Sequence, residues 1–469
     1  MARQSGFRRK TGVLLVVLAG LAGTARPAAA DPPKRKLDEL IDLARRRSKT
    51  IGVAKAELAV RESQRRMANW LWTPMGDVTY AFTGAPRIEC RGPGNNADPN
   101  VRVRECVDTV DPNTGQSVSA VSSGIGGVGM QAEVNLLQPL YTFGKIESAI
   151  DAARHGVDAA KAGVEGARWD AEVDVTRAYW AAKGARTAME TLSSVRGELD
   201  PWIKKIEKDL DRPKPEYSFS DLQRLKVALD DLDVLQADLA RTRLIALAGL
   251  RALVGEDVDA DEDEMEPVND PLQTITWYET EAARHRPEVR ALDAGAAAFH
   301  SLARLRRSEL LPDVGITTNV LLRYTSSVET PDNVFMWQAT VVRFGVFLAL
   351  RQPLDFFQKW SRYKNAQADA SLFEAKRTLA LTGMDFEIRI AYAEQEEARR
   401  RLAATDHGQH TARGWLTAVK QTLDLGTADP RDLADAARRY VELRLRYLLA
   451  IVDVNVSAAR LRRVAGVIR

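Results

Sequence analysis

Two stretches of the chain alternate between apolar and polar residues, which is the period of a β-strand with one apolar and one wet face. They lie at 128–136 and 342–351, and each follows a shorter stretch of the same kind, at 78–82 and 314–322. We therefore predict four strands in two β-hairpins, at about 75–140 and about 312–353. Because four strands cannot close a sheet alone, their edges need partner chains or a barrel.

The rest of the chain has helical periodicity. Apolar and small residues recur at spacings of three and four from Ile146 to about Asp211, and a second pattern of similar length runs from Phe357 to about Leu423. At 1.5 Å per residue each helix would be roughly 100 Å long, which no globular core requires. Four shorter helices are predicted, and two of them placed end to end match one long helix. They cover roughly 37–69, 219–253, 272–309 and 431–465.

The chain also repeats itself. The segment 138–145 (QPLYTFGK) returns at 352–359 as QPLDFFQK, with five of eight positions identical. Each copy lies between a strand pattern and a long helical pattern. We interpret this as a tandem duplication, with repeats at 31–254 and 272–469 joined by an acidic connector at 255–271.

The first thirty residues have the pattern of a secretory signal peptide. A basic start is followed by a short apolar stretch and by the small residues Ala28, Ala29 and Ala30. Removing residues 1–30 takes away five basic residues and no acidic one, so the formal net charge changes from +3 to −2. The remaining basic residues alternate with acids, which argues against a nucleic-acid partner.

The only two cysteines, Cys90 and Cys106, enclose a segment rich in Gly, Pro, Asn and Asp. Export to an oxidising compartment favours a disulfide that closes about 17 residues and contributes on the order of 3 kcal/mol. Two unrelated free thiols are the alternative.

No catalytic or metal-binding signature stands out, and no cofactor is expected. His407 and His410 have the spacing of two ligands on one helix face, but no third ligand with motif spacing lies nearby. The acidic run 256–270 resembles a calcium loop, yet Glu264 occupies the position where that loop needs glycine. We expect exposed histidines, a solvated connector and no enzyme activity.

Three segments together resemble the TolC-like outer-membrane efflux protein family: 138–145, its echo at 352–359, and 425–436 (LGTADPRDLADA). The order of helix, hairpin, long helix, turn and helix, given twice, covers essentially the whole mature chain. The resemblance implies a mainly α-helical protein with a membrane β-barrel part. In that family three protomers each give four strands to a twelve-stranded barrel, and long coiled-coil helices continue it as a tunnel across the periplasm.

The resemblance also implies function and partners. A homotrimer in the outer membrane would conduct substrates passively. An inner-membrane pump would supply the energy, and a periplasmic adaptor would contact the helix tips. Leu425, Gly426 and Thr427 match the tip turn that adaptors contact. The first tip turn departs from the pattern, because the segment from Asp211 to Tyr217 holds two prolines and no glycine.

Family positions at the closed entrance are only partly kept. Leu423 and Ala428 stand where well-known members have aromatic and basic lock residues. Asp221 matches an acidic lock position without that partner, so a closed state must be held by other contacts. Asp432 and Asp435 match the acidic positions of a ring at the periplasmic entrance.

The leading hypothesis is therefore the exit duct of an efflux pump or a type I secretion system. A periplasmic coiled-coil adaptor or scaffold is the rival, but it would not place four strands in two hairpins of bilayer length.

Overall fold

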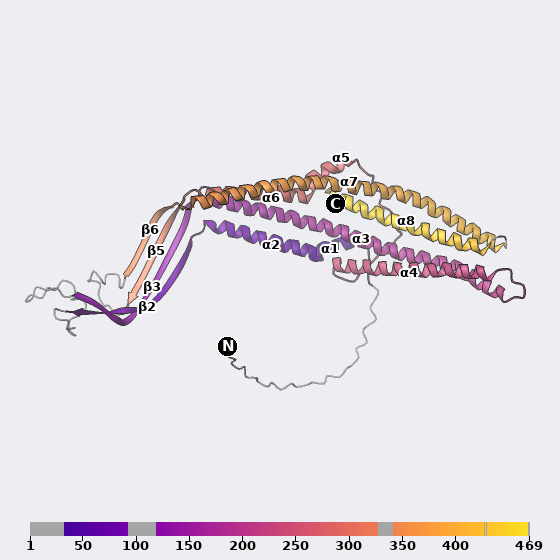
Figure 1. Ribbon diagram of the computed structural model, residues 1–469, viewed down its shortest axis with the longest axis horizontal. Coiled ribbons are helices and arrows are strands. Elements are labelled where there is room, and N and C mark those ends of the chain that lie inside the picture. The colour runs from indigo at the N-terminus through magenta and orange to yellow at the C-terminus, as the bar shows by residue number, and fades with distance from the viewer. Residues whose placement is uncertain (1–31, 92–118, 327–340, 426, 428, 468–469) are drawn as a thin grey trace, which may run out of the picture.

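The computed structural model describes residues 32–91, 119–326, 341–425, 427 and 429–467. Long helices lie side by side along the longest axis of the molecule, and a β-sheet continues from one end of them (Figure 1). Two helix turns lie at the opposite end (Figure 1).

Both halves of the chain have the same order of elements. The first half contains α1 (Leu37–Arg47), α2 (Lys49–Asn69), a 3-10 turn (Trp70–Trp72), β2 (Met75–Arg91), β3 (Ser119–Tyr141), α3 (Lys145–Leu210) and α4 (Phe219–Val254). The second contains α5 (Ile275–His285), α6 (Pro287–Ser308), β5 (Asp313–Thr325), β6 (Val341–Arg351), α7 (Phe356–Asp424) and α8 (Pro430–Val464). With 66 and 69 residues, α3 and α7 confirm the two predicted long helices. None of the described helices combines the length and the apolar character needed to cross a membrane.

Two of the predicted shorter helices are interrupted, which the periodicity did not indicate. The pattern at 37–69 breaks at Ser48 (φ −58°, ψ 131°), and the pattern at 272–309 breaks at Arg286 (φ −65°, ψ 125°). Pro287 explains the second break, because the residue before a proline is disfavoured in the helical region and proline suits the first helical position. The sequence around Ser48 offers no comparable reason.

In the described residues β2, β3, β5 and β6 form one antiparallel sheet, in that spatial order. Its register confirms the predicted alternation, because apolar rows alternate with rows that are mainly polar, in which Leu321 and Phe347 are among the exceptions. One row consists of Val78, Val134, Val320 and Phe344, and the next of Thr79, Glu133, Leu321 and Arg343. Large apolar side chains on the first face are open to the surroundings, with Phe344 71% and Leu348 75% exposed.

The opposite face of the sheet is mainly polar and internally hydrogen-bonded, although Phe347 (62% exposed) also lies on it. The side-chain amide of Asn319 donates to Asn135 Oδ1 (2.6 Å) and to Glu133 Oε1 (3.1 Å). The guanidinium of Arg323 donates to Gln131 Oε1 (3.0 Å). These contacts join β3 to β5 on the polar side, so each face of the sheet has its own chemistry.

The glutamines of the repeated motif, Gln138 and Gln352, form equivalent hydrogen bonds in the two halves. Gln138 Nε2 donates to the carbonyl oxygens of Trp72 and Pro139, both at 2.9 Å. Gln352 Nε2 donates to the carbonyl oxygens of Leu310 and Pro353, both at 3.2 Å. Each glutamine thus joins the end of the second strand of its hairpin to the segment that precedes the first strand.

The acidic connector is the main departure from the sequence prediction, since part of it is buried rather than solvated. Val258, Asp259 and Ala260 are at most 2% exposed, and Met265 is 8% exposed. Asp259–Ala260 forms β4, which pairs in parallel with β1 (Lys34–Arg35) near the start of the described chain. The aspartates that suggested a solvated run are here held by basic side chains from other elements.

We call these contacts the connector clasp. The ammonium group of Lys183, a side chain 3% exposed, donates to Asp261 Oδ1 (2.7 Å), and the hydroxyl of Tyr179 donates to Asp261 Oδ2 (2.7 Å). Arg243 of α4 pairs with Asp259 (2.6 Å). On the other side, the backbone N–H of Val268 donates to Asn455 Oδ1 (2.8 Å) in α8. The clasp therefore joins α3, α4 and α8.

The charge of Asp261 is favoured by its partners. Burial disfavours the carboxylate, but hydrogen bonds from Lys183 and Tyr179 outweigh it and hold the pKa of Asp261 below its usual range. A depressed pKa in the folded state stabilises the fold above the unfolded value of about 3.9. This contribution is lost as the pH falls through the folded-state pKa of Asp261.

We predict that Lys183→Met lowers the free energy of unfolding by about 3 kcal/mol, because it leaves the largely buried carboxylate of Asp261 without its cationic partner. Lys226→Met is the control, since Lys226 and Glu207 form an exposed pair (2.8 Å; side chains 44% and 45% exposed) whose loss costs less than about 1 kcal/mol. Urea unfolding in mild detergent, followed by far-ultraviolet circular dichroism, measures both. Equal small losses would show that the clasp contributes no more than a surface pair.

Candidate functional site

The turn between α3 and α4 is organised by a buried carboxylate. Asp209, 5% exposed, accepts hydrogen bonds from the backbone N–H groups of Glu216 (2.7 Å) and Tyr217 (3.1 Å). The N–H of Tyr217 is the main reason that the pKa of Asp209 lies below its usual range. This carboxylate satisfies backbone groups that the helix ends leave free, in a turn without glycine.

A capping box begins α4 directly after this turn. Ser218 Oγ accepts a hydrogen bond from the backbone N–H of Asp221 (3.2 Å). The Asp221 carboxylate accepts in return from the backbone N–H (3.0 Å) and the hydroxyl (2.6 Å) of Ser218. Reciprocal capping of this kind fixes where the helix starts.

The turn between α7 and α8 is built differently. Asp429 caps α8 by accepting the N–H of Arg431 (2.9 Å), and Pro430 takes the first helical position. The N–H and hydroxyl of Thr427 both donate to the carbonyl oxygen of Thr422 (3.0 Å each). Leu425 is 78% exposed at the apex. Of the predicted contact residues Leu425, Gly426 and Thr427, the glycine lies outside the described residues, as does Ala428.

The two turns are connected by an ion pair within the chain. Arg431 Nε lies 3.3 Å from Asp221 Oδ1. Asp221 therefore has a partner in Arg431, although Ala428 cannot supply the basic lock partner of the family. Hydrogen bonds from Ser218 and, next, from Arg431 hold the pKa of Asp221 below its usual range. Leu423 is 1% exposed and belongs to the apolar core beside the turns.

Asp432 and Asp435 lie in the first turns of α8 and are both exposed, while Leu433 between them is buried. Within the described residues neither carboxylate forms an ion pair or accepts a side-chain hydrogen bond. The nearby cations point elsewhere, because Arg431 contacts Asp221 and Arg438 pairs with Asp231 of α4 (2.7 Å). The structure thus leaves both acidic groups on the open face of α8.

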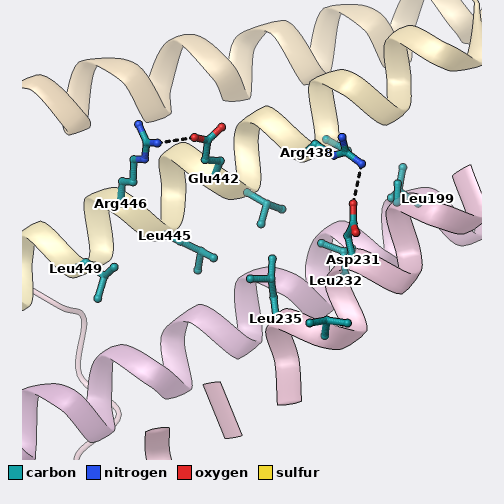
Figure 2. Close-up of a pocket in the computed structure, with 13 residues that line it drawn as sticks. Leu199, Asp231, Leu232, Leu235, Arg438, Glu442, Leu445, Arg446 and Leu449 are labelled. Atoms are coloured by element: carbon teal, nitrogen blue, oxygen red, sulfur yellow. Dashed lines mark hydrogen bonds and ion pairs between the residues drawn. The ribbon is translucent and has the colours of Figure 1, made fainter. Parts of the chain in front are cut away.

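A groove opens between α4 and α8 beside the Asp231–Arg438 pair. Its volume is about 530 Å³, and most of its lining is apolar. Leu235 of α4 and Leu445 and Leu449 of α8 lie along it, with ion pairs at its edge (Figure 2). Sequence periodicity missed this groove, because it arises where two helices from different halves diverge.

The remaining candidates form no chemical centre. His407 and His410 are exposed, and His410 Nε2 lies 3.5 Å from Asp406 Oδ1. In the part of the chain that the structure describes, no group of three His, Cys, Asp or Glu side chains is arranged to hold a metal ion. Cys106 lies outside the described residues, so its bridge to Cys90 stays a prediction.

Comparisons with known proteins agree with this architecture. Residues 280–467 match the sequence profile of the outer membrane efflux protein family. No curated protein sequence shows a significant match to the chain.

Several solved structures share the fold over nearly the whole chain. A membrane protein from Pseudomonas aeruginosa superposes with a TM-score of 0.72 at 15% identity, covering 94% of this chain and 93% of the other. The CmeC outer membrane channel of Campylobacter jejuni gives 0.71 at 13% identity, with 92% and 85% covered. The open MtrE outer membrane channel of Neisseria gonorrhoeae gives 0.70 at 16% identity, with 92% and 89% covered. These matches show that the chain shares the fold of these solved structures.

We predict that Asp209→Ala loosens the α3–α4 turn, because the N–H groups of Glu216 and Tyr217 lose their acceptor. Hydrogen exchange of these two amides should become markedly faster, while amides within α4 change little. Asp211→Ala is the control, since Asp211 is exposed and follows in the same turn. If both variants exchange like the wild type, the carboxylate of Asp209 does not hold the turn.

Proposed function

We propose that this chain, whose second half carries an outer membrane efflux protein domain, is a subunit of an outer-membrane exit duct. Proteins of that family are channels rather than enzymes. The duct would serve a tripartite efflux pump or a type I secretion system, and it would conduct substrates passively from the periplasm or the pump to the outside. An inner-membrane pump would supply the energy, and a periplasmic adaptor would contact the helix turns.

The observation that carries the proposal is a two-faced sheet joined directly to helices of about 100 Å. One face exposes large apolar side chains, such as Val342 (74%) and Phe344 (71%), which water does not favour. The other face holds the polar network around Asn319. Lipid on the first side and an aqueous lumen on the second account for both, as in transmembrane β-barrels.

The open edges of the sheet support a homotrimer. β2 and β6 are the outer strands, and each lacks a partner on one side within the described residues. Hydrocarbon offers no hydrogen bonds to such groups, so a sheet in lipid must close on itself. Three copies would give a closed twelve-stranded barrel in which every edge is paired.

The helices support the same assembly. Contacts run from α2 to α3, from α3 to α6 and from α6 to α7, so α2 and α7 are the outer helices beside the sheet. Each has exposed apolar residues spaced by seven, the repeat of a coiled-coil seam. They are Val53, Val60 and Met67 on α2, and Leu372, Leu379 and Phe386 on α7, all at least 53% exposed. A neighbouring copy would bring the two stripes together.

A periplasmic adaptor or scaffold is the alternative function. It would use the long helices but would have no reason to expose a bilayer-length apolar sheet face. We therefore favour the duct, with its β-barrel in the outer membrane and its helical tunnel in the periplasm.

The test is native mass measurement of protein extracted from outer-membrane fractions in mild detergent. We expect a trimer that dissociates on heating. A stable monomer with full strand content, or a protein absent from the outer membrane, would contradict the proposal.

We further propose that Asp432 and Asp435 form the acidic ring of the periplasmic entrance. In a trimer they make six carboxylates, and their spacing of three puts both on one helix face. Their exposure supports this role, as does the engagement of Arg431 and Arg438 with α4. A constriction narrower than the Debye length of about 8 Å would leave the ring poorly screened. Cations should then concentrate at the entrance.

We predict that the double variant Asp432→Ala, Asp435→Ala loses most of the cation preference and the block by trivalent cations in planar-bilayer recordings. Asp230→Ala is the control, because Asp230 is an exposed acid on α4. If the double variant conducts like the wild type, the two aspartates merely favour the N-terminal end of α8 electrostatically.

A further inference from the structure

Two charged side chains without a full complement of partners lie on opposite edges of the sheet. Asp77 belongs to β2, and its carboxylate receives only a long hydrogen bond from the Thr79 hydroxyl (3.4 Å). Arg351 ends β6 and is exposed, and its guanidinium has no hydrogen-bond or ion-pair partner among the described residues. Asp313 stands opposite Arg351 in the register, but its carboxylate is paired with Lys145.

Asp77 and Arg351 share the polar face of the sheet. Asp77 lies in register with Asn135, and Asn135 with Asn319, both members of the polar network. Arg351 lies in register with Asp313, an even number of residues from Asn319 on β5, so it points to the same side. An acid and a base thus face the same space from the two unpaired edges.

The direction of the strands allows these edges to meet. Each neighbouring pair in the sheet is antiparallel, so β2 and β6 run in opposite directions. When a second copy is placed beside the first with the same orientation, its β2 runs antiparallel to β6. The seam therefore continues the pattern of the sheet.

The stagger of the strands fixes which residues meet. Met75, at the start of β2, is in one row with Leu137, Thr317 and Phe347. From Phe347, β6 continues for four residues toward the helices, ending at Arg351. Measured from the strand ends nearest the helices, a row of paired residues therefore climbs by about four residues from β2 to β6. The tilt of strands in a barrel requires such an offset.

The remaining pairing, between β6 and β2 of the next copy, completes this climb, which is the offset along the strands from one copy to the next. Because residues on one face pair only with residues on the same face, the climb per copy is an even number of residues, four or about six. A climb of six puts Arg351 directly opposite Asp77 of the neighbouring copy. A climb of four puts it opposite Met75 of that copy, with Asp77 as the diagonal neighbour. Both arrangements bring the two charges within reach of each other.

We propose that Arg351 of one copy forms an ion pair with Asp77 of the next copy at each of the three seams. The proposal rests on the homotrimer proposed above. The pair restricts the seam to these two registers, at an edge where backbone bonding alone would tolerate further slips. It lies on the aqueous side of the barrel, near the junction with the helices.

The test is charge reversal, read as the temperature at which the trimer band dissociates in detergent. Arg351→Asp and Asp77→Arg should each lower this temperature, because like charges then meet at every seam, and the double reversal should restore most of it. Arg343→Asp is the matched control, since Arg343 is an exposed arginine farther along β6 on the same face. Combining it with Asp77→Arg should restore nothing.

Cysteine cross-linking provides a second readout that does not depend on stability. In a chain with Cys90→Ser and Cys106→Ser that still forms trimers, Asp77→Cys with Arg351→Cys should give covalent trimers on oxidation. Asp77→Cys with Arg343→Cys should give far fewer, because Arg343 lies on the same face but eight residues from Arg351 along β6.

The outcomes separate the two proposals. A wild-type protein that forms no trimer would overturn the assembly itself. A wild-type trimer that shows neither rescue by double reversal nor cross-linking through positions 77 and 351 would overturn only the seam contact.

Discussion

Close packing around α3 is the interaction on which the rest of the structure depends. This helix contacts α2 and α6 beside the sheet and α4 and α8 beyond it. Small residues make the approach possible. A Cβ atom at Gly184 would lie 2.9 Å from Val452 Cγ2 of α8, closer than such atoms approach one another. Because α3 is surrounded on several sides, it holds the two halves of the chain in line with the sheet.

The two halves have equivalent helices and strands, but different side-chain contacts stabilise their turns. Gln138 and Gln352 make the same contacts at the sheet, where both hairpins must enter in the same way. At the other end, one turn is held by the buried carboxylate of Asp209 and the other by the cap at Asp429. The helices and strands follow from hydrophobic patterns that both halves share, whereas the contacts that stabilise the turns depend on single residues that differ.

Much of this architecture could be predicted from the sequence, because the strands and the long helices each have a period that a local pattern reveals. The break at Arg286 had a local signal in Pro287, but the clasp had none. Lys183 and Asp261 are 78 residues apart, and nothing near either one identifies the other. For the same reason no local pattern pairs Asp221 with Arg431, from which it is separated by 210 residues. Hydrophobic periodicity predicts the helices and strands. Ion pairs between them can be identified only when their positions in space are known.

The placement of the ion pairs suggests how the molecule divides into fixed and movable parts. Arg438–Asp231 is an exposed pair, and Arg431–Asp221 joins a half-exposed guanidinium to a buried carboxylate; both tie α8 to α4 near the turns. The clasp ties α3, α4 and α8 together farther toward the sheet, through the buried side chains of Lys183 and Asp259. Exposed pairs cost little to separate, and buried ones cost several kcal/mol. A movement that separates α8 from α4 at the turns would therefore break the outer pairs first and pivot about the clasp.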